Sequence, residues 1–219
     1  MGVRAVQVAD LGIIGAQVDA IAEDLAPAAW KTGMLATAEV IEVVVDRLQE
    51  HGVKRLVVDP VMVAKSGAQL LAPEAVEAMR GRLLPLALVL TPNLPEVTAL
   101  TGISVSGAAE ARRAALALAA MGPRVVVVKG GHADTDPVVD FVLDARDGSW
   151  TEMVNPRVPG SSTHGTGCTF SAAITAFLAR GLEPLEAVTR ARAYLQGALL
   201  RAPGLGSGHG PLGHLPDLS

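Results

Sequence analysis

The stretch Leu56-Val57-Val58-Asp59-Pro60 is a short apolar run that ends in a carboxylate and a proline. A run of aliphatic residues rich in β-branched side chains is typical of a strand that is buried on both faces. Proline cannot continue a strand inside a sheet, so the chain is expected to turn directly after Asp59. We therefore predict a buried parallel strand over residues 56–59, with an acidic side chain at its carboxyl end.

The same kind of apolar run recurs on both sides of this stretch. It predicts further strands at residues 28–32, 87–91 and 125–129. The segments between the strands repeat apolar side chains at helical spacing, which predicts amphipathic helices at residues 36–51, 73–83 and 110–121. Strands that alternate with helices in this way build a parallel sheet from βαβ crossovers.

The pattern changes after Lys129. Residues 138–143 and 150–154 flank Arg146-Asp147-Gly148-Ser149, a polar turn with glycine, which predicts a hairpin. Two further helices are predicted at residues 167–180 and 184–201, followed by a Gly/Pro-rich loop from Pro203 onward. We expect residues 1–219 to form a single α/β domain with a mostly parallel central sheet and helices on both faces.

The composition excludes several classes of protein. Of the 219 residues, 50% are hydrophobic and 18% are charged, and the formal net charge is −4. The mean hydropathy of +0.38 is high, but the chain lacks the ~18 consecutive apolar residues of a membrane-spanning helix. The basic residues are scattered and are not interleaved with aromatic ones, so we expect neither a membrane nor a nucleic acid as partner.

Cysteine usage and the N-terminal sequence bear on the compartment. Cys168 is the only cysteine, so the chain has no internal disulfide. The N-terminus shows no basic segment, apolar run and cleavage site of the kind that make a signal peptide. We expect a cytoplasmic protein.

The strongest local signal for chemistry is the turn Thr163-His164-Gly165-Thr166-Gly167-Cys168-Thr169, which precedes a long apolar helix pattern. Its glycines allow successive backbone N–H groups to converge, and a helix N-terminus adds partial positive charge, so the turn suits an anion such as phosphate. Gly165 and Gly167 could instead only form a tight turn that Thr166 or Thr169 caps. Cys168 could accept a proton because its thiolate is stabilised at a helix start, although a lone cysteine is more often a small buried residue.

Charged side chains follow three of the predicted strands. Asp59 ends one strand, Glu96 lies in the first turn of a helix after the next strand, and Lys129 precedes Gly130-Gly131. Ligands of open parallel sheets bind outside the carboxyl ends of the strands, so we expect these side chains to lie together. Two carboxylates suit Mg²⁺, and a lysine can neutralise phosphoryl charge, as a kinase requires. Taken singly, each also has a structural explanation as a turn former, a helix-start carboxylate or a solvated strand end.

Five motifs stand in the order found in hydroxymethylpyrimidine/phosphomethylpyrimidine kinases, and the resemblance covers almost the whole chain. They are Lys31-Thr32-Gly33-Met34-Leu35, Val58-Asp59-Pro60-Val61-Met62, Thr91-Pro92-Asn93, Lys129-Gly130-Gly131-His132 and Thr163-His164-Gly165-Thr166-Gly167-Cys168-Thr169. The resemblance implies a ribokinase-like three-layer fold, ATP and Mg²⁺ as cofactors, and a homodimer. It also implies two successive phosphorylations of 4-amino-5-hydroxymethyl-2-methylpyrimidine in thiamine biosynthesis.

The resemblance carries roles to individual positions of this sequence. It implies an anion hole, in which Cys168 is the base that takes the hydroxymethyl proton. It also implies two carboxylates on the magnesium and phosphate side and a set of nucleotide contacts. Finally, it implies a pyrimidine pocket in which a thioether packs against the ring. The anion hole is Gly165, Thr166, Gly167 and Cys168; the metal carboxylates are Asp59 and Glu96; the nucleotide contacts are Lys129, Thr166 and Asn93; and the pocket is Gly33, Met34 and Val61.

Two features leave alternatives open. Many pyridoxal kinases and most ribokinase-like enzymes have aspartate where this chain has Cys168, which favours the pyrimidine kinases over pyridoxal kinase. Family members also begin with a strand, a Gly-Ser-Asp-Ser-Gly-Gly-type loop and an acceptor-binding glutamine, whereas this chain starts with Met1-Gly2-Val3 after that point. We expect a βαβ-sized unit, on the order of 30 residues or more, to be absent. A non-catalytic nucleotide-binding remnant is therefore a third reading.

Overall fold

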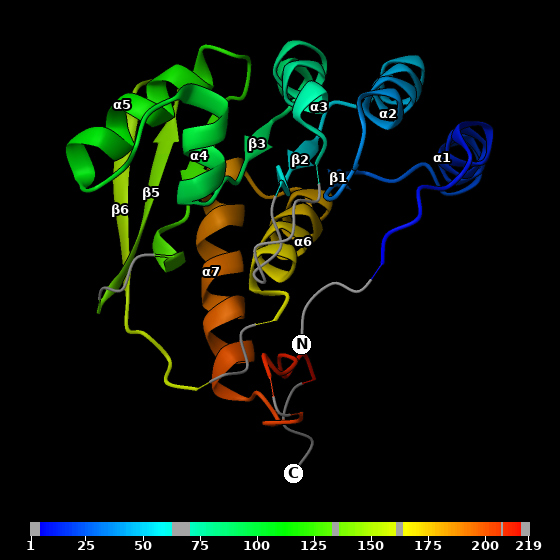
Figure 1. Ribbon diagram of the computed structural model, residues 1–219. Coiled ribbons are helices and arrows are strands. Elements are labelled where there is room, and N and C mark those ends of the chain that lie inside the picture. Colours follow the sequence, from blue (N-terminus) through cyan, green and yellow to red (C-terminus); the bar gives the residue numbers. More distant parts are fainter. Residues whose placement is uncertain (1–4, 63–70, 133–135, 161–163, 207, 216–219) are drawn as a thin grey trace.

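The computed structural model describes residues 5–62, 71–132, 136–160, 164–206 and 208–215, and its elements follow one another around a single sheet (Figure 1). The six strands lie in the sheet in the same order as in the chain. Their bounds are β1 (Trp30–Thr32), β2 (Leu56–Val58), β3 (Val89–Leu90), β4 (Val125–Val128), β5 (Val138–Asp144) and β6 (Ser149–Asn155). Strands β1 to β4 pair in parallel, and β5 and β6 add the predicted antiparallel hairpin.

Helices cover both faces of the sheet, as predicted. One face carries α2 (Ala38–Glu50), α3 (Pro73–Ala78), α4 (Leu94–Thr101) and α5 (Ala108–Ala119), and the other carries α6 (Thr166–Ala179) and α7 (Pro184–Leu200) (Figure 1). Successive side chains of a strand point to opposite faces, so Val126 and Val128 belong to the first core and Val125 and Val127 to the second. The predicted α/β arrangement of three layers is thereby confirmed.

The predicted helix over residues 73–83 is shorter than expected. Helix α3 ends at Ala78, and the chain continues as a π-helical turn, η1 (Met79–Leu83), and a 3-10 turn, η2 (Leu84–Leu86). Pro85 has no N–H group to donate, so a regular helix cannot continue through it. A further 3-10 turn, η3 (Gly130–His132), follows β4 and bears on the site described below.

Helix α1 (Leu11–Leu25) was not predicted from the sequence. Its apolar side chains do not form one buried stripe, since Ile13, Ile21 and Leu25 are exposed and Gly15 is buried. The signal that could have revealed it is the cap, because Asp10 Oδ1 accepts the N–H groups of Gly12 at 2.9 Å and Ile13 at 3.2 Å. The helix lies beside α2 at the margin of the molecule (Figure 1). In the described part of the chain, no helix is long and apolar enough to cross a membrane.

Gly122, in the connection between α5 and β4, provides a test of the packing against the turn η2. Its φ is +125°, and a Cβ there would lie 2.5 Å from the Cα of Pro85. We expect Gly122→Ala to lower the free energy of unfolding by about 2–5 kcal/mol, from backbone strain plus overpacking. The matched control is Gly181→Ala, with φ +89° and no atom within 4 Å of the added Cβ, which should cost about 1–2 kcal/mol. Urea unfolding checks both; equal losses would contradict the packing argument.

Candidate active site

The parallel register brings the carboxyl ends of four strands to one edge of the sheet. Thr32 pairs with Val58, Val58 with Leu90, and Leu90 with Val126, so the residues that follow these strands share that edge. The polar motifs of the sequence therefore meet in space. This convergence is what the sequence pattern predicted for the charged side chains.

Asp59 is the centre of the polar cluster. It is only 2% exposed, and Lys129 Nζ lies 2.9 Å from its Oδ1. The hydroxyl of Thr91 donates to the same Oδ1 at 3.3 Å, and that of Ser171 reaches Oδ2 at 3.2 Å. Both carboxylate oxygens are thus occupied by protein donors, which fixes the orientation of the side chain.

Thr91 and Ser171 were not identified from the sequence as site residues. Thr91 ends the predicted strand before Pro92-Asn93, and Ser171 lies four residues after Gly167 in α6. Residues four apart on a helix share a face, so the position of Ser171 beside the anion turn could have been found from helical spacing. Nothing in the local sequence indicates that both hydroxyls bind the same carboxylate.

Lys129 lies between Asp59 and the turn over residues 163–169, which was predicted to bind an anion and is called the anion turn below. Burial lowers the pKa of its ammonium, but the carboxylates of Asp59 and Glu96 outweigh that effect and raise the pKa above its ordinary value. A Cβ on Gly167 would lie 3.2 Å from Lys129 Nζ and 3.8 Å from Asp59 Oδ2. Glycine at position 167 therefore leaves the ammonium open to the first turn of α6.

The anion turn forms the start of α6, as predicted. Gly165 is the N-cap, with φ +79°, and Thr166, Gly167 and Cys168 make up the first turn. The first N–H groups of a helix have no intrahelical acceptor and are available to an anion. The Cys168 side chain is exposed beside them. Thr163, the first residue of the motif, lies outside the described residues.

The loop before α6 is held by the C-terminal tail, which is irregular as predicted. The N–H of His164 donates to Gly210 O at 3.1 Å, and the N–H of Gly213 donates to Ala198 O at 3.0 Å. Leu212 is 6% exposed and belongs to the core under α6 and α7. The tail thus ties the anion turn to the end of α7.

Glu96 and Asn93 form a capping box at the start of α4. The Asn93 side chain accepts the N–H of Glu96 at 2.9 Å, and Glu96 Oε2 accepts the N–H of Asn93 at 2.7 Å. Glu96 is 4% exposed. Burial raises the pKa of its carboxyl to about 7, although the Lys129 ammonium opposes the shift. Both residues are near Lys129, since Asn93 also forms an isolated parallel bridge with it.

The carboxylates suit a magnesium ion that is shared with a ligand. No cluster of three or more His, Cys, Asp or Glu side chains that could hold a metal occurs within the described ranges. Mg²⁺ is usually bound by one or two carboxylates together with water and substrate phosphates, rather than by a full protein cage. Asp59 and Glu96 are close enough to influence each other electrostatically and lie near the start of α6, so they fit such an ion.

The three residues assigned to the pyrimidine pocket lie at the same edge. Gly33 and Met34 follow β1, and Val61 follows β2 with its N–H bound to Asp59 O at 2.8 Å. Met34 is 40% exposed. The structure therefore places these residues beside the polar cluster.

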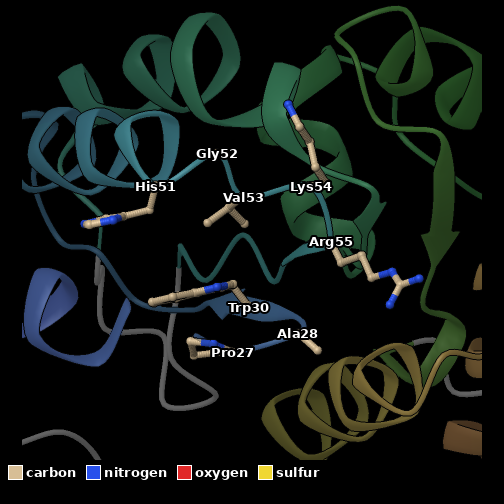
Figure 2. Close-up of a pocket in the computed structure, with 8 residues that line it drawn as sticks. All are labelled: Pro27, Ala28, Trp30, His51, Gly52, Val53, Lys54 and Arg55. Atoms are coloured by element: carbon tan, nitrogen blue, oxygen red, sulfur yellow. The ribbon is translucent and has the colours of Figure 1, made fainter. Parts of the chain in front are cut away.

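A hollow of about 460 Å³ lies elsewhere, at the amino ends of β1 and β2 (Figure 2). Its lining consists of Pro27, Ala28, Trp30, His51, Gly52, Val53, Lys54 and Arg55. In Figure 2 the Lys54 and Arg55 side chains point away from the Trp30 ring. Because ligands of such sheets bind at the opposite ends of the strands, this hollow is not the candidate active site.

The fold and the site together define a small-molecule kinase of the ribokinase-like type. Comparison with known proteins specifies it further: the chain belongs to the phosphomethylpyrimidine kinase family, whose profile matches residues 1–213. The hydroxymethylpyrimidine/phosphomethylpyrimidine kinase of Bacillus subtilis is 40% identical over 215 residues, which span 98% of this chain and 79% of the relative.

Two solved structures show the same fold. The phosphomethylpyrimidine kinase of Clostridium difficile superposes with a TM-score of 0.76 at 38% identity, covering 89% of this chain and 79% of that one. The pyridoxal kinase of Staphylococcus aureus, in complex with AMP-PCP and pyridoxal, has a TM-score of 0.87 at 33% identity, covering 96% of this chain and 75% of that one. The family predicted from the five motifs is confirmed.

The raised pKa of Glu96 gives a pH-dependent prediction. A carboxyl with a pKa of 4.5 when unfolded and about 7 when folded keeps its proton in the native state between those values. Stability is therefore lost as pH rises from 4.5 to 7, by up to about 3 kcal/mol. Glu96→Gln keeps the capping acceptor but not the titration.

We expect the stability difference between Glu96→Gln and the wild type to grow in favour of the variant across this window. Urea unfolding in EDTA at several pH values from 5 to 8 measures it. The control is Glu74→Gln in the first turn of α3, where the residue is exposed. Its free energy of unfolding should change with pH in the same way as that of the wild type. Parallel curves for Glu96→Gln and the wild type would show that Glu96 titrates normally.

Proposed function

We propose that this chain transfers the γ-phosphoryl group of ATP to hydroxymethylpyrimidine and then to its monophosphate, forming the diphosphate used in thiamine biosynthesis. The observation that carries the proposal is the position of Lys129 Nζ, 2.9 Å from Asp59 and open to the first turn of α6 across Gly167. This geometry supports the proposal because a positive charge beside a helix N-terminus suits a phosphate group. The named activities of the family members support the same reaction.

The nucleotide phosphates would lie against the first turn of α6. The backbone N–H groups of Thr166, Gly167 and Cys168 would bind the transferred phosphoryl oxygens, and Lys129 would neutralise their charge. Asn93 would add a contact from its side-chain amide, because its oxygen already accepts the Glu96 N–H. ATP as the donor is supported by the AMP-PCP complex of the S. aureus relative, since AMP-PCP is an ATP analogue.

Magnesium would neutralise further phosphate charge when bound, with Asp59 and Glu96 as its protein ligands. The role of the chain is to present the two carboxylates on the same side of the phosphates. Asp59 is oriented for this by Thr91 and Ser171. Glu96 is oriented by the backbone of Asn93.

The acceptor would bind between the ends of β1 and β2, against Gly33, Met34 and Val61. Its hydroxyl oxygen forms a bond to the γ-phosphorus as the bond to the β-phosphate oxygen breaks, and ADP leaves. Cys168, at the start of the helix, would take the hydroxyl proton. In the second reaction the acceptor is already an anionic phosphate, so positioning and charge neutralisation by the α6 turn and Lys129 carry that step.

Pyridoxal kinase is the second candidate, because a pyridoxal kinase superposes closely on this chain. The identity of residue 168 favours the pyrimidine kinase, as cysteine stands where many pyridoxal kinases have aspartate. Residues 1–219 would act as one kinase domain, and the resemblance to the family supports a cytoplasmic homodimer.

A coupled ATP-consumption assay on the 219-residue chain tests the function. We expect turnover with hydroxymethylpyrimidine and with its monophosphate under Mg²⁺, and slower turnover with pyridoxal. Gly167→Ala tests the site itself, because the added methyl group would lie 3.2 Å from Lys129 Nζ. This variant should fold normally, and its kcat should fall at least about tenfold in both reactions. Faster turnover of pyridoxal would favour the second candidate, and a folded but inactive wild type would indicate a non-catalytic remnant.

Cys168→Ala separates the two phosphorylations. We expect the first to fall by roughly 10- to 100-fold, because the alcohol proton loses its acceptor. The second should fall by less than about fivefold, because its acceptor oxygen carries no proton that must be removed. Steady-state kcat values for the two acceptors, measured on the same preparation, give the comparison. Equal losses would assign Cys168 a positional role only.

A further inference from the structure

The turn that carries Lys129 is held by a side chain from the neighbouring strand. Asp140 of β5 accepts the N–H of Gly130 through Oδ1 at 2.9 Å. Gly130 packs so closely on β5 that a Cβ would collide with Val139 O. The peptide group directly after Lys129 is therefore fixed by a buried hydrogen bond on one side and by backbone contact on the other.

Asp140 is in turn held by an arginine from α7. Arg192 Nε lies 2.9 Å from Asp140 Oδ2, and the two residues are 6% and 5% exposed. Arg192 Nη1 is 3.4 Å from Gln196 Oε1, and Gln196 Nε2 donates to Pro156 O at 3.0 Å. A chain of contacts thus runs from α7 through β5 to the turn after β4.

This pair is unlike the other ion pairs of α7. Arg190 and Glu186, one turn apart on the same helix, also pair, but both are more than half exposed. A buried ion pair costs desolvation energy, and an apolar pair of similar volume often gives equal or higher stability. Burial raises the pKa of Asp140, and the Arg192 guanidinium and the Gly130 N–H oppose that shift. Stability alone therefore does not account for the buried charges.

We propose that Asp140 and Arg192 are positioning residues of the kinase, which hold the Lys129-Gly130 turn so that the Lys129 ammonium faces Asp59 and the first turn of α6. Asp140 supplies the acceptor that fixes Gly130, and Arg192, whose Nε lies 2.9 Å from Asp140 Oδ2, holds the carboxyl group in place. Neither residue touches the reacting atoms. The inference rests on the proposed role of Lys129 in phosphoryl transfer.

The geometry explains why the turn needs such support. Lys129 reaches Asp59 at 2.9 Å, and its own N–H donates to Pro92 O at 2.9 Å, so its main chain connects β3 and β4. The next two residues are glycines, which restrain the backbone least. A displacement of about 1 Å in a charge that stabilises a transition state can cost about 100-fold in rate. An external acceptor for Gly130 limits that displacement.

Two double variants separate positioning from stability. Asp140→Leu with Arg192→Met removes both charges and the acceptor for Gly130. Asp140→Asn with Arg192→Gln also removes both charges but keeps a side-chain oxygen for the Gly130 N–H. We expect the first pair to lower kcat about 10- to 100-fold with the KM for the pyrimidine within about twofold, and the second pair to restore most of kcat. Arg190→Met, on the exposed face of α7, is the control and should match the wild type.

Thermal unfolding of each variant shows whether it is folded. If both double variants are folded and have the same kcat, the positioning role is wrong. If Asp140→Leu with Arg192→Met does not fold, Asp140→Ala with Arg192→Gln replaces it in the comparison, because the asparagine of the other double variant still keeps an acceptor for the Gly130 N–H and the alanine does not. Equal kcat values for these two would also overturn the proposal.

A second readout is independent of turnover. Calorimetric titration with ATP and Mg²⁺ should show that Asp140→Leu with Arg192→Met weakens the affinity for ATP about threefold or more. Asp140→Asn with Arg192→Gln should restore that affinity. An inactive wild type would refute the proposed function, and this titration would still decide the positioning role, since equal ATP affinities would overturn it.

Discussion

The ion pair between Asp59 and Lys129 is the interaction on which the rest of the site depends. It joins β2 to the turn after β4, 70 residues apart in sequence, at 2.9 Å and with almost no exposure of the carboxylate. A buried charge without a partner costs several kcal/mol, so each of these side chains requires the other to be in place. Thr91 and Ser171 complete the coordination of Asp59 and connect it to β3 and to α6.

The sheet makes this arrangement possible because its two faces bury separate cores. Val126 and Val128 pack under the first helical layer, while Val125 and Val127 pack under α6 and α7. The strand is packed from both sides, so Lys129, which follows its carboxyl end, is held in position at the edge of the sheet. The second layer also carries the first turn of α6, so the same packing positions both the Lys129 ammonium and the N–H groups of that turn.

Glu96 shows how one side chain can serve structure and chemistry together. As part of the capping box it satisfies the Asn93 N–H and fixes the start of α4. Its burial raises its pKa to about 7, while the nearby Lys129 ammonium favours the ionised form. A carboxyl of this kind is available as a ligand when a cation approaches, because added positive charge favours ionisation further.

The sequence by itself determined the class of fold and the family, and it supplied the candidate site residues. Apolar runs and helical spacing are local patterns, so β2, β4, α2 and the β5–β6 hairpin could be predicted within a few residues, and the five motifs marked the family. Helix α1 was missed because its apolar residues form no single buried stripe. Only the tertiary structure decided that Thr91 and Ser171 bind Asp59 and that Asp140 and Arg192 hold the turn after Lys129. These contacts join residues far apart in the chain, and they depend on strand register and on how α6 and α7 pack on the sheet, which no local pattern records.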